Sequence, residues 1–117
     1  MPFIISRVNI AVTDEQEEKI KAALGRAIEL VPEKTEEYLM IIFENNSHIW
    51  LRGNNSEPYA YIEAKIFGNE NHNGYNALSM EIAKIYNSIL KIAPENIYVM
   101  YEDIKTWGVR GFTFERW

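Results

Sequence analysis

The 117-residue sequence contains no cysteine and only two histidines, His48 and His72. Without cysteine the chain cannot build a disulfide framework, a thiolate nucleophile, a zinc ribbon or an iron–sulfur cluster. A pair of histidines also argues against a multi-histidine metal centre. We therefore expect no metal site and no cofactor.

Positive charge and long apolar runs are also scarce. The sequence has 12 basic against 17 acidic residues, a formal net charge of −5, which argues against a nucleic-acid partner. No apolar run approaches the ~20 residues of a membrane span. The N-terminal segment 1–8 is too short for a signal peptide and lacks its leading basic region. We expect a cytoplasmic protein with neither a membrane nor a nucleic acid as partner.

The length predicts a single domain over residues 1–117, since domains cluster at about 100–150 residues. Hydrophobic residues make up 47% of the sequence, which is typical of a globular chain and far from disorder. A domain of this size buries limited surface, so a partner subunit is an early expectation.

The first half of the chain has a strand–helix–strand pattern. Residues 3–8 are β-branched and aromatic, which predicts a strand. A capping-box sequence at Thr13 then precedes apolar residues that recur at helical spacing from Ile20 to Val31. The continuous apolar run 38–43 is typical of a strand that is covered on both faces.

The same pattern returns in the second half. Residues 48–51 suggest a short third strand, 59–66 predict a further strand, 78–89 an amphipathic helix and 97–101 a last strand. The recurrence predicts a tandem βαβ duplication with pseudo-repeats at about 2–45 and 58–103, followed by a tail over 104–117.

This duplication predicts an α/β (α+β) fold with a four-stranded mixed sheet and two helices on one face. Each βαβ unit should be right-handed with parallel strands. Nothing in the chain is left to cover the other sheet face, although strands 38–43 and 59–66 are apolar on both sides. An uncovered apolar face predicts self-association. The aromatic tail is expected to pack against a neighbouring subunit.

Four features in order resemble the tautomerase superfamily, in its macrophage migration inhibitory factor branch. Met1-Pro2 leads directly into a strand, and Lys34 stands four residues before Tyr38. The loop 53–58, Gly-Asn-Asn-Ser-Glu-Pro, precedes the third major strand. The segment 94–103 has a valine–tyrosine core and a trailing aspartate after the second helix.

The resemblance implies a homotrimer of such subunits, with the sheets facing a central channel, and a catalytic proline. Methionine before proline is normally removed, so Pro2 would carry a free secondary amine. An α-amino group has a pKa near 8. Burial and the nearby Lys34 cation both lower that pKa toward neutral pH, where a general base works best.

The family's function implies a cofactor-independent keto–enol tautomerase of phenylpyruvate-like 2-keto acids. Lys34 would bind the substrate carboxylate, the backbone N–H of Ile66 would contact substrate, and Tyr98 of an adjacent subunit would line the pocket. Trp107 is a candidate for the pocket wall and Arg52 for a second carboxylate ligand.

The sequence departs from the family at two of these places. Met100 stands where an asparagine is frequent, and Arg52-Gly53 replaces paired glycines. The Cys-x-x-Cys of some animal members is absent, so their proposed thiol chemistry does not carry over.

Other interpretations stay open. The chain could be a trimeric binding or signalling protein with little or no catalysis, especially if Met1 is retained. It could also run another proline-based reaction, such as decarboxylation or the hydration of an unsaturated acid. Individually, Lys34 also fits a helix C-terminal cation, Tyr98 a packing aromatic and Arg52 a solvated loop charge.

Overall fold

The computed structural model describes residues 1–116. The first unit contains β1 (Pro2–Val8), α1 (Asp14–Ala27), 3₁₀ turns at Ile28–Leu30 and Glu36–Tyr38, and β2 (Met40–Glu44). The second contains β3 (Ala60–Phe67), α2 (Tyr75–Leu90), a 3₁₀ turn at Pro94–Asn96, and β4 (Ile97–Ile104). The chain then forms a hairpin from β5 (Thr106–Val109) and β6 (Phe112–Glu115).

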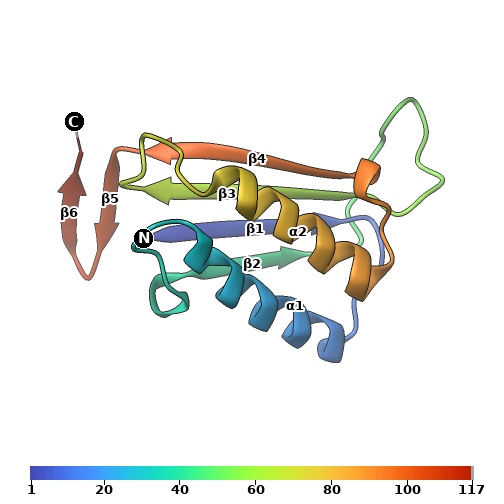
Figure 1. Ribbon diagram of the computed structural model, residues 1–117. Coiled ribbons are helices and arrows are strands. Elements are labelled where there is room, and N and C mark those ends of the chain that lie inside the picture. The colour runs from blue at the N-terminus through green and yellow to red at the C-terminus, as the bar shows by residue number, and fades with distance from the viewer. Residues whose placement is uncertain (117) are drawn as a thin grey trace.

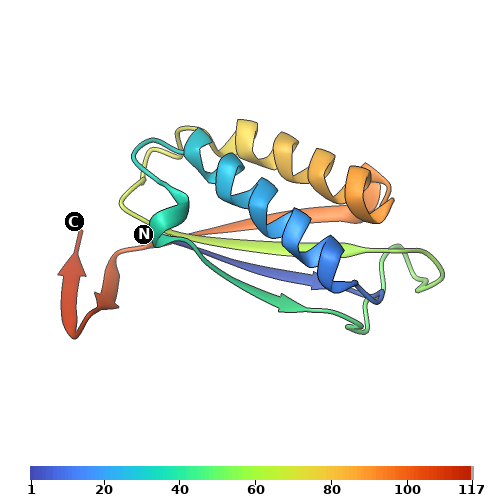
Figure 2. The ribbon, with the colours of Figure 1, turned by 90° about the horizontal axis from the view of Figure 1, so that it is seen from below.

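The four long strands form one mixed sheet in the order β2-β1-β3-β4. β1 is parallel to β2 and β3 to β4, whereas the central pair β1–β3 is antiparallel. Both helices lie on the same face of this sheet, and the opposite face has no layer over it (Figures 1 and 2). The predicted tandem βαβ fold is confirmed.

Each helix starts and ends for a local reason. The Thr13 hydroxyl accepts from the Gln16 N–H at 3.1 Å, and the Gln16 side chain accepts from the Thr13 N–H at 2.9 Å. α2 instead follows Gly74, whose φ of +85° suits glycine. A Cβ there would lie 2.1 Å from the Leu30 carbonyl oxygen, so only glycine permits the two units to approach this closely.

The core lies between the helices and the covered sheet face. It includes the fully buried Ile4, Leu24, Ile62 and Ile82. No helix within residues 1–116 combines the length and apolarity needed to cross a bilayer.

Two strand predictions need correction. The strand expected at 38–43 runs over Met40–Glu44 instead, because residues 36–38 form a 3₁₀ turn, and within one chain the helices cover only one of its faces (Figure 2). Met40 and Ile42 consequently stay 62% and 42% exposed on the uncovered face. Residues 48–51 form no strand; the only pairing there is an isolated bridge between Leu51 and Asn54.

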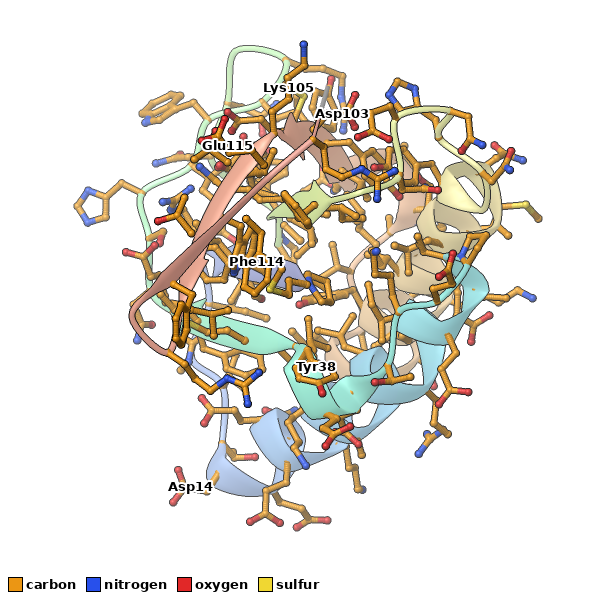
Figure 3. All side chains as sticks on the ribbon, turned by 90° about the vertical axis from the view of Figure 1, so that its left-hand side faces the viewer. Asp14, Tyr38, Asp103, Lys105, Phe114 and Glu115 are labelled. Atoms are coloured by element: carbon orange, nitrogen blue, oxygen red, sulfur yellow. The ribbon has the colours of Figure 1, made fainter. Side chains whose placement is uncertain are left out.

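The tail forms a hairpin that extends beyond the end of the sheet, past the N-terminus (Figures 1 and 2). Figure 3 looks onto this end of the molecule, with Lys105 and Glu115 at the base of the hairpin. Trp107 contacts Phe67 of the sheet, with ring centroids 6.4 Å apart, but Phe112 is 69% exposed. Packing of the tail on a neighbouring subunit stays a prediction.

One polar contact crosses the core, and it gives a stability test. The buried Tyr86 hydroxyl donates to the buried Ser6 hydroxyl at 2.7 Å. Tyr86→Phe should lower the free energy of unfolding by about 1–2 kcal/mol, because Ser6 loses its buried partner. Urea denaturation at fixed protein concentration measures this change.

The matched control is the double variant Ser6→Ala/Tyr86→Phe, which removes both polar groups. It should be at least as stable as Tyr86→Phe alone, since no unpaired hydroxyl is left in the core. The single variant Ser6→Ala completes the comparison. If the loss of unfolding free energy in the double variant equals the sum of the losses in Ser6→Ala and Tyr86→Phe, the two hydroxyls are not coupled and the prediction is contradicted.

Candidate functional site

The candidate site lies where the chain begins, at one end of the central strand pair. Pro2 is buried and pairs with Ile66 of β3, while its neighbour Phe3 pairs with Met40 of β2. Because β1 is an inner strand, the N-terminus enters the middle of the sheet rather than an edge. An α-amino group placed there is partly shielded from water.

Lys34 lies beside this amino group. It follows the first helical unit, where its N–H donates to the Val31 carbonyl at 3.2 Å, and the residue is only 9% exposed. Burial, and next the Lys34 ammonium, lower the pKa of the Met1 amine from 8.0 to about 6. The structure thus brings the N-terminus and Lys34 together, and both predicted causes act on the amine.

The backbone N–H that faces the N-terminus belongs to Phe67. It donates to the Met1 carbonyl at 3.1 Å. Ile66 lies opposite Pro2 in the ladder, and its side chain is 1% exposed in the core. Because successive backbone N–H groups of a strand point in opposite directions, the donor that faces the N-terminus is one residue past Ile66, for which the resemblance implies a substrate contact. The β1–β3 register is the signal that identifies it.

A second residue that the sequence did not single out is Arg116, which lies just past β6. A Cβ built on Gly68, directly after β3, would lie 3.2 Å from Arg116 Nη1 and 3.8 Å from Lys34 Nζ. The two cations therefore flank the same glycine.

The loop that carries Gly68 is held by a cluster at the end of β4. Asp103 contacts His72 Nε2 at 2.6 Å and accepts from the Tyr75 hydroxyl at 3.2 Å. Tyr75 also stacks on Tyr101, with centroids 4.3 Å apart. Burial and the Asp103 carboxylate raise the pKa of Tyr75 to about 12. The cluster fixes the loop from outside the candidate site.

No protein-family model matches the sequence, and no curated protein matches it. The structure, however, is similar to solved ones. Leishmania major MIF2 is 26% identical over 97% of both chains, with a TM-score of 0.88. The chain has the macrophage migration inhibitory factor fold of the tautomerase superfamily.

Two more distant structures are similar in fold. Pt0534, inactivated by 2-oxo-3-pentynoate, is 13% identical over 93% of each chain, with a TM-score of 0.81. A fused 4-OT, described as an asymmetric trimer, is 20% identical, with a TM-score of 0.80 over 95% of this chain and 94% of that one.

Within this tautomerase fold, the remaining predicted residues divide into two groups. Trp107 reaches the candidate site, through its contact with Phe67. Tyr98 pairs with Tyr61, five residues along β4 from the level of Pro2, which is about 16 Å at the usual strand rise. Arg52 lies at that far end as well. Its guanidinium donates to the Asn96 side chain and to the backbone carbonyl that precedes it.

The uncovered sheet face connects these two ends. A diagonal row of ion pairs crosses all four strands, linking Glu44, Arg7, Glu63, Lys65 and Glu102 at 2.9–3.5 Å. On one side of the row lie Phe3, Ile5, Met40 and Ile42, and on the other Tyr98 and Met100. The face therefore carries two separate apolar areas of unlike composition.

The pKa of the amine provides a test of the site's electrostatics. In protein that carries Met1, Lys34→Met should raise the pKa of the amine above about 6, because a neighbouring cation is lost. The pKa should stay below 8.0, since burial remains. The Met1 Cα chemical shift, followed by NMR from pH 4 to pH 10, measures this.

Lys21→Met serves as the control, because Lys21 is exposed and pairs with Glu36 away from the amine. It should leave the pKa of the amine unchanged. An unchanged pKa in Lys34→Met would contradict the proximity of the two groups.

Proposed function

We propose that this chain is a cofactor-independent keto–enol tautomerase of phenylpyruvate-like 2-keto acids, with Pro2 as general base after removal of Met1. The observation that carries the proposal is the half-buried Met1 amine beside Lys34, whose pKa is lowered to about 6. Pro2 is buried one residue further along the same strand, so burial and the Lys34 cation are expected to lower the pKa of its amine in the same direction once Met1 is removed. Such an amine is mostly free base at neutral pH and still returns a proton readily, as a tautomerase requires. Inactivation of Pt0534 by 2-oxo-3-pentynoate, a 2-keto acid, supports this substrate class.

In the proposed ketonisation, the Pro2 nitrogen accepts the enol hydroxyl proton. The O–H electron pair forms the C=O bond, and the C=C pair takes a proton at C3. The protonated Pro2 amine supplies that proton, so the base is regenerated. Lys34 binds the carboxylate and stabilises charge that develops on the substrate oxygen.

Removal of Met1 changes a second group besides Pro2. The Met1 carbonyl accepts the Phe67 N–H at 3.1 Å, so its loss frees this donor beside the new amine. We assign to Phe67 the substrate contact that the family resemblance placed on Ile66. An oriented backbone donor of this kind stabilises an enolate oxygen without reorganisation.

The site is completed by a neighbouring copy in a homotrimer. The apolar area around Met40 and the one around Tyr98 lie on opposite sides of the ion-pair row, so contact of one area with the other area of a neighbouring copy would cover both. Contact between unlike surfaces joins copies head to tail, and it forms a closed ring when the rotation between neighbouring copies closes, as in a trimer. This arrangement brings Tyr98 and Met100 of one copy toward Pro2 of the next. The trimeric state of the fused 4-OT supports it.

The second candidate function is a trimeric binding or signalling protein. It is favoured if Met1 stays in place, because Pro2 is then an amide nitrogen without basicity and the Phe67 N–H stays occupied by Met1. Intact-mass measurement of protein from its native host separates the two. Loss of one methionine mass supports catalysis, and full retention contradicts it.

Phenylpyruvate ketonisation tests the chemistry directly. With Met1 absent, Pro2→Gly should lower kcat/KM by about 10²–10⁴, because a primary amine in a looser position replaces the held base. Lys34→Met should raise KM and lower kcat, since the carboxylate loses its cation. Stopped assays at pH 7 with the enol form measure both.

Lys21→Met is again the matched control and should keep wild-type kinetics. Equal kcat/KM in wild type, Pro2→Gly and Lys34→Met would contradict the catalytic proposal and favour the binding protein.

The trimer is tested by charging one apolar area. Met40→Glu should shift the mass in solution from three times 13.7 kDa toward the monomer, because a carboxylate would be buried in the contact. Met80→Glu is the matched control, since Met80 is 58% exposed on α2 against 62% for Met40. Light scattering at micromolar concentration gives the masses. If Met40→Glu stays trimeric like Met80→Glu, or if the wild type is a monomer, the proposed assembly is wrong.

A further inference from the structure

Two cationic side chains meet at Gly68. A Cβ built on Gly68 would lie 3.2 Å from Arg116 Nη1 and 3.8 Å from Lys34 Nζ. The two nitrogen atoms therefore cannot be further apart than the sum of these two distances. Gly68 has a φ of +82°, which suits glycine, and any side chain here would fill the space between them. The absent Cβ keeps that space open.

Arg116 is held in this position from both ends. Its backbone N–H donates to the Lys105 carbonyl at 2.8 Å, at the base of the hairpin. Its Nη2 contacts Glu70 Oε2 at 3.5 Å, so one side of the guanidinium faces Glu70 while Nη1 faces Gly68. Arg116 also lines a polar cavity of about 280 Å³ together with Asn69. The guanidinium is half-exposed and open to a ligand.

The charge pattern favours an anion between these groups. Lys34 is about nine-tenths buried, yet it forms no ion pair within residues 1–116. Burying an unpaired cation is costly, and a second cation nearby adds repulsion. A carboxylate relieves both costs, because each of its oxygens can accept one charge-assisted bond of about 2.8 Å. The limited separation of the cations suits one carboxylate bridging them.

We propose that Arg116 is a second substrate-binding residue of this site and that, with Lys34, it clamps the single carboxylate of the 2-keto acid over Gly68. This inference rests on the proposed function. The clamp makes the free carboxylate the group that the site selects, because esters and amides of the same acids lack the negative charge that both cations pair with. Glu70 is a positioning residue, because it acts only through Arg116.

Substrate pairs that differ only in charge test the clamp. Arg116→Ala should raise KM for phenylpyruvate about tenfold, with kcat little changed, and leave the kinetics of methyl phenylpyruvate at the wild-type level. Arg116→Lys should recover part of the loss, since an ammonium keeps the charge but not the fork. Glu70→Gln should raise KM for phenylpyruvate by a smaller factor and leave KM for methyl phenylpyruvate unchanged. Arg26→Ala, an exposed arginine on α1, is the control and should change neither substrate.

A rise in KM that is equal for acid and ester would overturn the clamp, because a structural disturbance affects both. Unchanged KM for the acid would overturn it as well. If the wild type turns over neither compound, the proposed function fails, and the clamp is judged by NMR titration with hydrocinnamate and its amide. Arg116→Ala should then weaken hydrocinnamate binding about tenfold and spare the amide. Equal binding by wild type and variant would overturn the clamp independently of catalysis.

Discussion

The antiparallel pairing of β1 with β3 is the constraint on which the rest of the molecule depends. It joins two parallel βαβ units back to back, which forces both helices onto one face. It also makes the first strand an inner one, so the N-terminus starts between two neighbours at the level of Ile66. An ordinary α-amine at a frayed terminus is solvated, whereas this one is half-buried beside Lys34. The lowered pKa is therefore a consequence of topology.

The same topology leaves a sheet face that a chain of 117 residues cannot cover. The diagonal of ion pairs prevents this face from being one continuous apolar surface. The proposed trimer would cover both apolar areas by contact between unlike surfaces of neighbouring copies. In the proposed trimer the far end of one copy would serve the near end of the next, which would explain why Tyr98 lies far from Pro2 within one chain.

Sequence reasoning reached the features whose cause is local. The capping box at Thr13 and the two strand–helix–strand units depend on residues close in the chain, and both predictions are confirmed. It misplaced the strand expected at 38–43, because an apolar pattern does not reveal the 3₁₀ turn over residues 36–38 that delays its start. It missed Phe67, because direction in a strand alternates with every residue and only the register settles it. Arg116 reaches Gly68 only through a hairpin whose position no local pattern encodes.

Met1 connects the open questions of catalysis and binding. While it is present, Pro2 nitrogen is an amide and the Phe67 N–H is satisfied by the Met1 carbonyl. Under the proposed function, removal of Met1 would create the base at Pro2 and uncover the Phe67 donor together. The backbone N–H groups of Lys34 and Arg116 donate to Val31 and Lys105, and neither of these contacts involves Met1. On the proposed mechanism, both forms would bind a carboxylate ligand through these two residues, whereas proton transfer would require the form without Met1. The catalytic and the binding protein are on this view two states of one site that differ by one residue.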